Sequence, residues 1–279
     1  MGIAFIDRDP SPSEVERLRL VLSTYQDGSG QLVSKDGQTL PGWRDFERTI
    51  AAVFGGKAQE NKYIFDVLLP DLTRPGIFSG ISCKMRRTLD DTRKTGRVTL
   101  ELSNSAGKFW KALSDYGLHQ QNYKSNPQIA GKALIALVER WHAEVSIQKG
   151  GSVDLSKSFY LALSWNKFGE YQLFKFPISL PMPETLQWDF PDVAESDGSQ
   201  RAGRRLRGKD NLGILFEWYG ESGAQLKYYP NVKNALWKSD TFRLETLPQD
   251  SIIQYSIMAK AKFYFPEHWV ATSKEDEEK

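Results

Sequence analysis

Three short segments with the character of β-strands follow one another closely, at residues 62–70, 79–87 and 97–102. They contain β-branched, aromatic and other hydrophobic residues, and turn-forming residues separate them. The connections, residues 71–78 and 88–96, are too short for a crossover, so each strand is expected to pair with the next in antiparallel order. The sequence therefore predicts a three-stranded meander, around which the rest of the chain must pack.

Helical patterns precede and follow this meander. Ser13 can cap a helix over about residues 14–25. A second helix begins at Trp43, carries hydrophobic residues at helical spacing and stops at the glycine pair 55–56. Two further helices are predicted at about residues 104–117 and 127–143.

The second half of the chain is rich in strand patterns. They dominate from about residue 158 onward and are interrupted by a predicted loop over residues 180–211. The chain contains no internal repeat and no clear linker, so residues 1–279 are expected to form a single domain. The predicted fold class is α/β: a mixed central sheet with flanking helices, plus a β-rich elaboration over about residues 145–270.

Composition narrows the class of protein. No apolar run approaches the ~20 residues that a membrane helix needs, and the N-terminal segment becomes acidic and proline-bearing too soon for a secretory signal. A single cysteine, Cys83, excludes an internal disulfide, a zinc finger and an iron–sulfur cluster. We therefore expect a cytoplasmic protein without a membrane partner.

Acidic and basic side chains are predicted to gather on one face of the meander. Side chains alternate along a strand, so Ser82 and Lys84 share a face. A connection centred near residue 74 places Asp66 opposite Ser82, and one centred near residue 91 or 92 places Glu101 opposite Ser82 as well. Two carboxylates beside a lysine can hold a divalent cation through hard oxygen ligands. A slip of one residue in either register would separate them.

The order of these elements carries a resemblance. A helix bearing Glu47 leads into a hairpin with Asp66, and the return strand carries the run Ser82-Cys83-Lys84. This arrangement resembles the catalytic core of the PD-(D/E)XK nucleases and, at this chain length, a type II restriction endonuclease. The resemblance covers about residues 42–117 and implies a restriction-endonuclease-like core.

The sequence departs from the family pattern at two places. Ser82 stands where the family has Asp or Glu. The literal Pro-Asp pair ends at Asp71, which falls in a predicted turn, so Asp66 is the favoured motif aspartate and Asp71 the alternative. Some restriction enzymes with serine at this position recruit an acid from elsewhere in the fold. Glu101 is the first candidate for that acid and Glu47 the second.

The resemblance also implies a reaction. Asp66 and either Glu101 or Glu47, with the backbone carbonyl of Cys83, would bind Mg²⁺. This ion would polarise the scissile phosphate and activate a water. Lys84 would orient that water and stabilise charge on the phosphate oxygens. The products would carry 5′-phosphate and 3′-hydroxyl ends.

Basic residues follow the candidate catalytic strand and recur later in the chain. The segment 201–209 holds five basic residues and no acid. Asn104 and Ser105 are expected near a helix N-terminus, where backbone amides can bind a phosphate. The basic residues predicted to contact the DNA backbone are Arg86, Arg87, Lys94, Arg97, Arg201, Arg204, Arg205, Arg207 and Lys209.

The resulting function is a Mg²⁺-dependent, sequence-specific endonuclease of double-stranded DNA, a hydrolase of a restriction–modification system. A homodimer is expected because a twofold-symmetric site needs two active centres. A cognate DNA methyltransferase is expected in the same system, though not in a complex with this chain. Two alternatives stay open: a structure-directed nuclease of repair, recombination or transposition, and a non-catalytic DNA-binding protein, which Ser82 favours.

Overall fold

The computed structural model describes residues 2–59, 64–194, 200–248 and 255–277. The α-helices are α1 (Pro12–Ser23), α2 (Trp43–Phe54), α3 (Leu89–Thr95), α4 (Ala106–Ser114), α5 (Pro127–Glu144), α6 (Ile257–Tyr264) and α7 (Pro266–Glu277). The strands are β1 (Leu32–Val33), β2 (Thr39–Leu40), β3 (Lys57–Ala58), β4 (Val67–Pro70), β5 (Phe78–Arg86), β6 (Leu100–Ser103), β7 (Phe159–Trp165), β8 (Glu170–Pro177), β9 (Gln187–Asp189), β10 (Asp192–Ala194), β11 (Gln200–Ala202), β12 (Leu206–Asp210), β13 (Gly213–Trp218), β14 (Leu226–Tyr228), β15 (Trp237–Lys238) and β16 (Phe242–Arg243).

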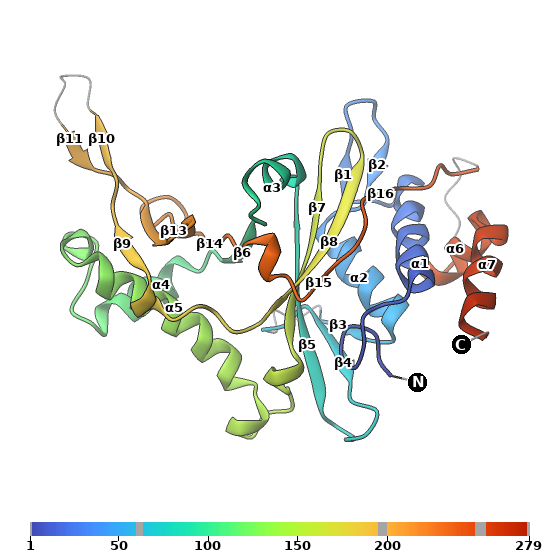
Figure 1. Cartoon of the computed structure of the whole chain (residues 1–279), viewed down its shortest axis with the longest axis horizontal. Coiled ribbons are helices and arrows are strands. Elements are labelled where there is room, and N and C mark those ends of the chain that lie inside the picture. The colour runs from blue at the N-terminus through green and yellow to red at the C-terminus, as the bar shows by residue number, and fades with distance from the viewer. Residues whose placement is uncertain (1, 60–63, 195–199, 249–254, 278–279) are drawn as a thin grey trace.

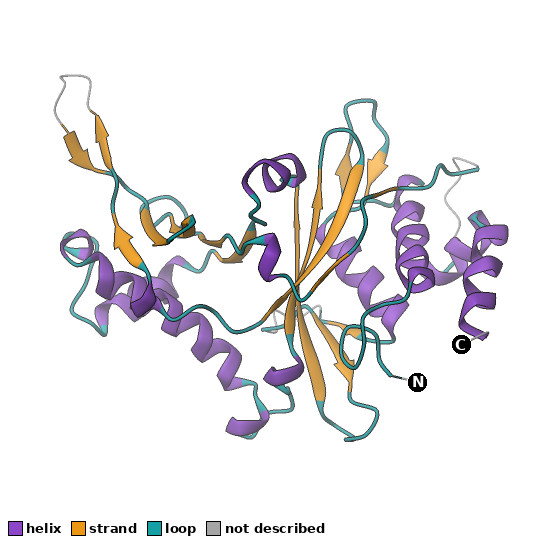
Figure 2. Cartoon of the chain, viewed as in Figure 1, coloured by secondary structure: helices purple, strands orange, loops and turns teal. Residues whose placement is uncertain are grey.

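A mixed sheet forms the centre of the described chain (Figure 1). Its strand order is β15-β8-β7-β5-β4-β3, and β16 also pairs with β8. Strands β5 and β7 are parallel, whereas the other pairs are antiparallel. Helices lie on both sides of this sheet, with α1 and α2 on one side and α4 and α5 on the other (Figure 2). The predicted α/β class is therefore confirmed.

The two faces of the central sheet have separate hydrophobic cores. On one face, Phe46 and Ile50 of α2 pack with Ile81 and Cys83 of β5. On the opposite face, Phe65 and strands β7 and β8 pack with α4, α5 and the second sheet. Alternation along β5 thus directs its apolar residues into the core beneath α2, as the strand pattern predicts.

A second sheet and a helical pair complete the fold. The second sheet has the strand order β6-β14-β13-β12-β9, and the β10–β11 hairpin extends away from it (Figure 1). Helices α6 and α7 pack against α1 through a small hydrophobic cluster. In the described part of the chain, no helix has the length and hydrophobicity needed to cross a membrane.

The predicted meander is only half correct. Strands β4 and β5 pair in the expected register, with Val67 opposite Ile81 and Leu68 opposite Gly80. The third strand, β6, does not pair with β5; it pairs with β14 in the second sheet. The edge of β5 is instead occupied by β7, in which every residue from Phe159 to Ser164 is buried. A strand buried on both faces belongs inside a sheet, and α3 turns the chain away before β6.

Some predicted boundaries are wrong for local reasons. The first helix begins at Pro12 rather than residue 14, because Ser11 and Glu14 form a capping box. The predicted loop 180–211 contains β9, β10, β11 and β12, whose polar residues hide the strand pattern. The C-terminal helices α6 and α7 were not predicted within the β-rich half. The helix over Trp43–Phe54 is confirmed, and Gly55 ends it in a left-handed conformation.

Gly80 allows β5 to approach the residue that precedes Asp66. A Cβ at Gly80 would overlap the ring of Phe65, which is fully buried. We expect Gly80→Ala to lower the free energy of unfolding by about 1–3 kcal/mol, because the packed ring must move. Urea denaturation measures this change. Gly107→Ala in α4 is the matched control, since no described atom lies within 4 Å of its Cβ and alanine favours the helix. Equal stability of the Gly80 variant and wild type would contradict this packing.

His142 is expected to make the free energy of unfolding decrease at acidic pH. Its ring stacks on Phe65 at 5.5 Å and meets Tyr160 edge-on at 6.0 Å. Burial, and secondarily the charge of Lys84, lower the pKa of His142 from 6.5 to about 4. Below pH 6.5 the unfolded chain binds a proton that the folded protein excludes. Stability should fall by on the order of 2–3 kcal/mol as the pH drops from 6.5 to 4.

Urea denaturation of wild type and His142→Gln across this pH range checks the effect. The variant should lose the part of the pH dependence that belongs to this residue. His119→Gln, at an exposed position, should keep the wild-type dependence. If His142→Gln also keeps it, the neutral buried histidine is not its source.

Candidate active site

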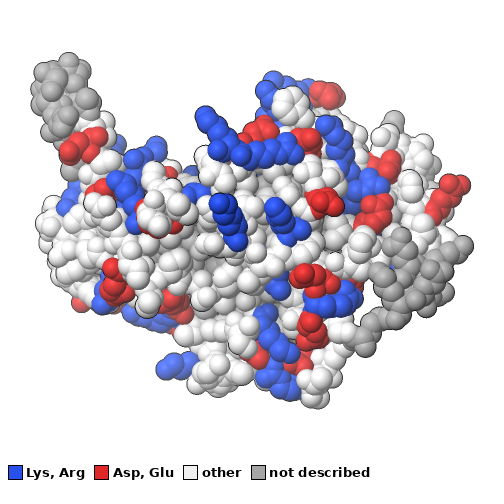
Figure 3. Space-filling view, in the orientation of Figure 1, with Lys and Arg blue, Asp and Glu red and all other residues white. Residues whose placement is uncertain are grey.

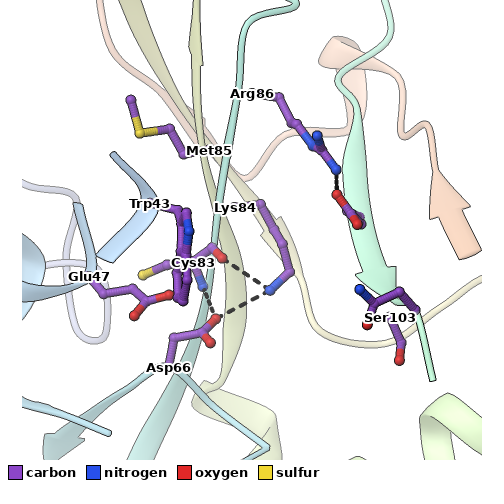
Figure 4. Close-up of a pocket in the computed structure, with 10 residues that line it drawn as sticks. Trp43, Glu47, Asp66, Cys83, Lys84, Met85, Arg86 and Ser103 are labelled. Atoms are coloured by element: carbon purple, nitrogen blue, oxygen red, sulfur yellow. Dashed lines mark hydrogen bonds and ion pairs between the residues drawn. The ribbon is translucent and has the colours of Figure 1, made fainter. Parts of the chain in front are cut away.

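A cavity of about 530 Å³ opens where α2, the β4–β5 hairpin and β6 meet (Figure 4). All four sequence-predicted catalytic residues, Asp66, Lys84, Glu101 and Glu47, line it. The full lining consists of Trp43, Glu47, Asp66, Cys83, Lys84, Met85, Arg86, Glu101, Ser103 and Asn104. Trp43 was not predicted as a site residue; it is 52% exposed at the first turn of α2.

Asp66 lies directly before β4 and is fixed by β5. Its backbone N–H donates to the carbonyl of Ile81 at 3.0 Å, which extends the antiparallel ladder by one residue. Its carboxylate oxygen Oδ2 accepts the backbone N–H of Cys83 at 2.7 Å and lies 3.4 Å from the Ser82 hydroxyl. Asp66 therefore stands opposite Ser82, as the hairpin register predicts.

Lys84 reaches the same carboxylate from β5. Its Nζ lies 3.2 Å from Oδ2 of Asp66 and 3.0 Å from the carbonyl oxygen of Cys83 (Figure 4). The Lys84 side chain is 16% exposed, so the ion pair is partly shielded from water. The Lys84 ammonium thus lies beside the Asp66 carboxylate and the Cys83 carbonyl, the two groups that the resemblance assigns to metal binding.

Glu47 approaches this pair from α2. Figure 4 shows the side chains of Glu47 and Asp66 directed toward each other. Burial, and after it the negative charge of Asp66, raise the pKa of Glu47 to about 7, although Lys84 acts in the opposite direction. Arg44 and Arg48 also act to lower this pKa, and it stays raised, so a cation bound beside the two carboxylates would favour the charged form of Glu47.

Glu101 lines the cavity but does not lie opposite Ser82. In β6 its cross-strand partner is Lys227 of β14. Its carboxylate forms an ion pair with Arg86 and accepts a hydrogen bond from the Gln225 amide. The predicted placement of Glu101 beside Ser82 is wrong, because β6 belongs to the second sheet.

The oxygen donors present fit Mg²⁺. Among the residues that the structure describes, no group of three or more His, Cys, Asp and Glu side chains is placed to hold a metal ion. Two carboxylates, Asp66 and Glu47, and the carbonyl of Cys83 nevertheless supply hard oxygen ligands at one cavity. Mg²⁺ commonly takes only one or two carboxylates and completes its shell with water and phosphate oxygens.

Asp71 has a different role in the chain. It lies in the β4–β5 connection, where its carboxylate accepts hydrogen bonds from Thr73 and Arg74. These contacts, the Thr73 hydroxyl first, hold the pKa of Asp71 well below its usual range. Asp71 is absent from the cavity lining, so it stabilises the turn while Asp66 faces the cavity.

Cys83 contributes its backbone groups to the site and not its thiol. Its thiol is free and buried beneath α2. Burial, followed by the charges of Asp66 and Glu47, raises the pKa of this thiol. A protonated, buried thiol is a poor nucleophile, so Cys83 serves the site through its N–H and carbonyl.

Most of the predicted DNA-contacting cations are held by acids of the protein itself. Figure 3 shows acidic side chains interspersed among the basic ones on the visible face. The ion pairs are Arg86–Glu101, Arg97–Asp210, Arg204–Glu221, Arg207–Glu217 and Lys209–Asp189. A paired cation has less charge to offer a phosphate, and nothing in the local sequence reveals these partners.

The remaining predicted contacts are more open. Arg87 stacks over the ring of Trp165 at 5.5 Å, and Lys94 is exposed in α3. Asn104 lines the cavity and Ser105 precedes α4. Arg201 lies in β11, but its side chain is outside the described part of the chain.

No protein-family model, no curated protein and no solved structure matches this chain.

Proposed function

We propose that this chain is a Mg²⁺-dependent endonuclease of double-stranded DNA, with a PD-(D/E)XK core of the restriction-endonuclease type. The observation that carries the proposal is the meeting of Asp66, Lys84 and Glu47 at one cavity. They come from a β-hairpin and the helix packed on it, which is the order of elements in that nuclease core. In this proposal Glu47 supplies the second carboxylate.

Each residue has a defined task in the proposed reaction. The chemistry that Mg²⁺ supplies when bound is polarisation of the scissile phosphate and activation of water. Asp66, Glu47 and the Cys83 carbonyl would hold the ion. Lys84, whose ammonium already lies beside Asp66, would orient the attacking water and stabilise charge on the phosphate oxygens. The water oxygen bonds to phosphorus, and the 3′-oxygen leaves, which gives 5′-phosphate and 3′-hydroxyl ends.

The proposed function implies an oligomeric state, a cellular location and a partner enzyme. Cleavage of both strands at a twofold-symmetric site favours a homodimer. A restriction–modification system would place the enzyme in the cytoplasm together with a separate cognate methyltransferase. Sedimentation of the protein with and without DNA measures the oligomeric state.

The experiment is incubation of linear duplex DNA of defined sequence with the protein and Mg²⁺. Fragments that end at discrete positions support a sequence-specific endonuclease. Cleavage restricted to branched or flapped DNA supports the alternative of a structure-directed repair or recombination nuclease. Binding without cleavage in Mg²⁺ or Mn²⁺ supports a non-catalytic DNA-binding protein, the alternative that Ser82 favours.

A further inference from the structure

A row of charged residues crosses the second sheet on the face opposite its hydrophobic core. Cross-strand pairing places Arg207 opposite Glu217, Glu217 opposite Lys227, and Lys227 opposite Glu101. The neighbouring positions, Leu206, Phe216 and Leu226 among them, are buried in the core. The row therefore runs along the sheet surface from β12 to β6. It ends at Glu101, which lines the candidate active site.

The acids of this row have their acceptor atoms occupied. Glu217 is 7% exposed and accepts from Arg207 at 2.9 Å, from the Tyr219 hydroxyl at 3.1 Å and from the Tyr229 hydroxyl at 2.9 Å. Glu101 is engaged by Arg86 and Gln225. Both oxygens of each carboxylate therefore already have a partner within the protein.

Two cations have no such ion pair: Lys227, which belongs to the row, and Arg205, which directly precedes β12. Arg205 lies 4.7 Å and Lys227 4.8 Å from the centre of the Tyr219 ring. Among the described residues, neither forms an ion pair with an acid. Burial, and next the charge of Arg86, lower the pKa of Lys227; Arg205 adds to this effect and Glu217 opposes it. Because Glu217 is already bonded to Arg207 and two tyrosine hydroxyls, the charges of Arg205 and Lys227 are left without an acidic partner among the described residues.

We propose that Arg205 and Lys227, held around Tyr219, bind a DNA backbone phosphate outside the scissile position. Both are cations of the kind that contact phosphates in nucleic-acid complexes, and the charged end of each lies over the Tyr219 ring. Lys227 is the cross-strand partner of Glu101, and Glu101 lines the cavity. One DNA strand can therefore contact both the cluster and the cavity. The choice of DNA as the ligand rests on the proposed function. The site itself is inferred from the positions of Arg205 and Lys227 around Tyr219.

The test measures binding without cleavage. The affinity of a fluorescein-labelled duplex of arbitrary sequence is measured by anisotropy in EDTA at several KCl concentrations. The double variant Arg205→Gln with Lys227→Gln should reduce the slope of log K against log salt by about 0.9, the value for one lost phosphate contact. Arg205→Lys, which keeps the charge, should retain most of the slope.

Lys124→Gln is the matched control. Lys124 also lies over a tyrosine ring, Tyr123, at 5.6 Å, but it is paired with Glu221 at 3.1 Å. Its loss should leave the slope unchanged. A double variant with the slope of this control would overturn the proposed phosphate site. A second result would also overturn it: millimolar inorganic phosphate binds at Arg205 and Lys227, but the double variant keeps the wild-type salt slope for DNA. That result would indicate a site for free phosphate.

The result is independent of the cleavage assay. A wild-type protein that binds DNA with the expected slope but does not cut it would refute the endonuclease and leave the phosphate site standing. If the wild-type protein cuts DNA but the double variant keeps the full salt slope, the endonuclease stands and the phosphate site is refuted.

Discussion

Glu47→Gln should lower Mg²⁺-supported DNA cleavage by about 10²-fold or more, whereas Glu101→Gln should keep most of the activity. The amide of glutamine preserves the shape of Glu47 but removes the charge that a cation needs. Glu47 shares the cavity with Asp66, and the charge of Asp66 helps raise its pKa to about 7. Glu101 is instead committed to Arg86 and Gln225.

Two measurements on these variants separate the assignments. Cleavage rates at saturating DNA report the reaction, and calorimetric titration with Mg²⁺ reports the affinity for the ion. Glu47→Gln should weaken both. If Glu101→Gln is the inactive variant and Glu47→Gln is active, the acid comes from the second sheet and our choice of Glu47 is wrong.

Lys84→Ala should reduce cleavage by a similar or larger factor while duplex binding persists. The ammonium is the positive charge closest to Asp66, at 3.2 Å, and the reaction needs it beside the phosphate. Lys84→Arg should also fail, because a planar guanidinium cannot replace a compact ammonium in a partly buried position. Cleavage rates and anisotropy measured on the same preparations distinguish lost chemistry from lost binding.

The control for this prediction is Lys157→Ala. Lys157 forms ion pairs with Asp7 and Asp71, away from the cavity lining. This variant should cut DNA at the wild-type rate. Wild-type turnover by Lys84→Ala would remove the lysine from the proposed mechanism.

The sequence predicted the part of the site that depends on local connections. The short turn between β4 and β5 fixes their register, so Asp66 could be placed opposite Ser82 from its sequence position alone. The helix with Glu47 was also predictable, because its apolar spacing and terminal glycines are local signals. These two elements account for Asp66, Lys84 and Glu47.

The placement of Glu101 could not be predicted in this way. The neighbour of β5 is β7, which begins at Phe159 and reaches the sheet only after α4 and α5. Such a long-range parallel pairing leaves no signal near Glu101. The partners of the basic residues also depend on tertiary structure: Arg97 pairs with Asp210, far along the chain, and Arg86 pairs with Glu101 from another sheet.

One measurement tests the central claim that Asp66, Glu47 and Lys84 form a phosphodiester-cleaving site. Supercoiled plasmid is incubated with Mg²⁺ and either wild-type protein or Asp66→Ala, and the termini of the products are sequenced and tested for phosphate. The account predicts that wild type produces breaks with 5′-phosphate and 3′-hydroxyl ends, whereas Asp66→Ala binds the plasmid and leaves it intact. Equal cleavage by the two proteins, or intact plasmid with wild type in both Mg²⁺ and Mn²⁺, would contradict it.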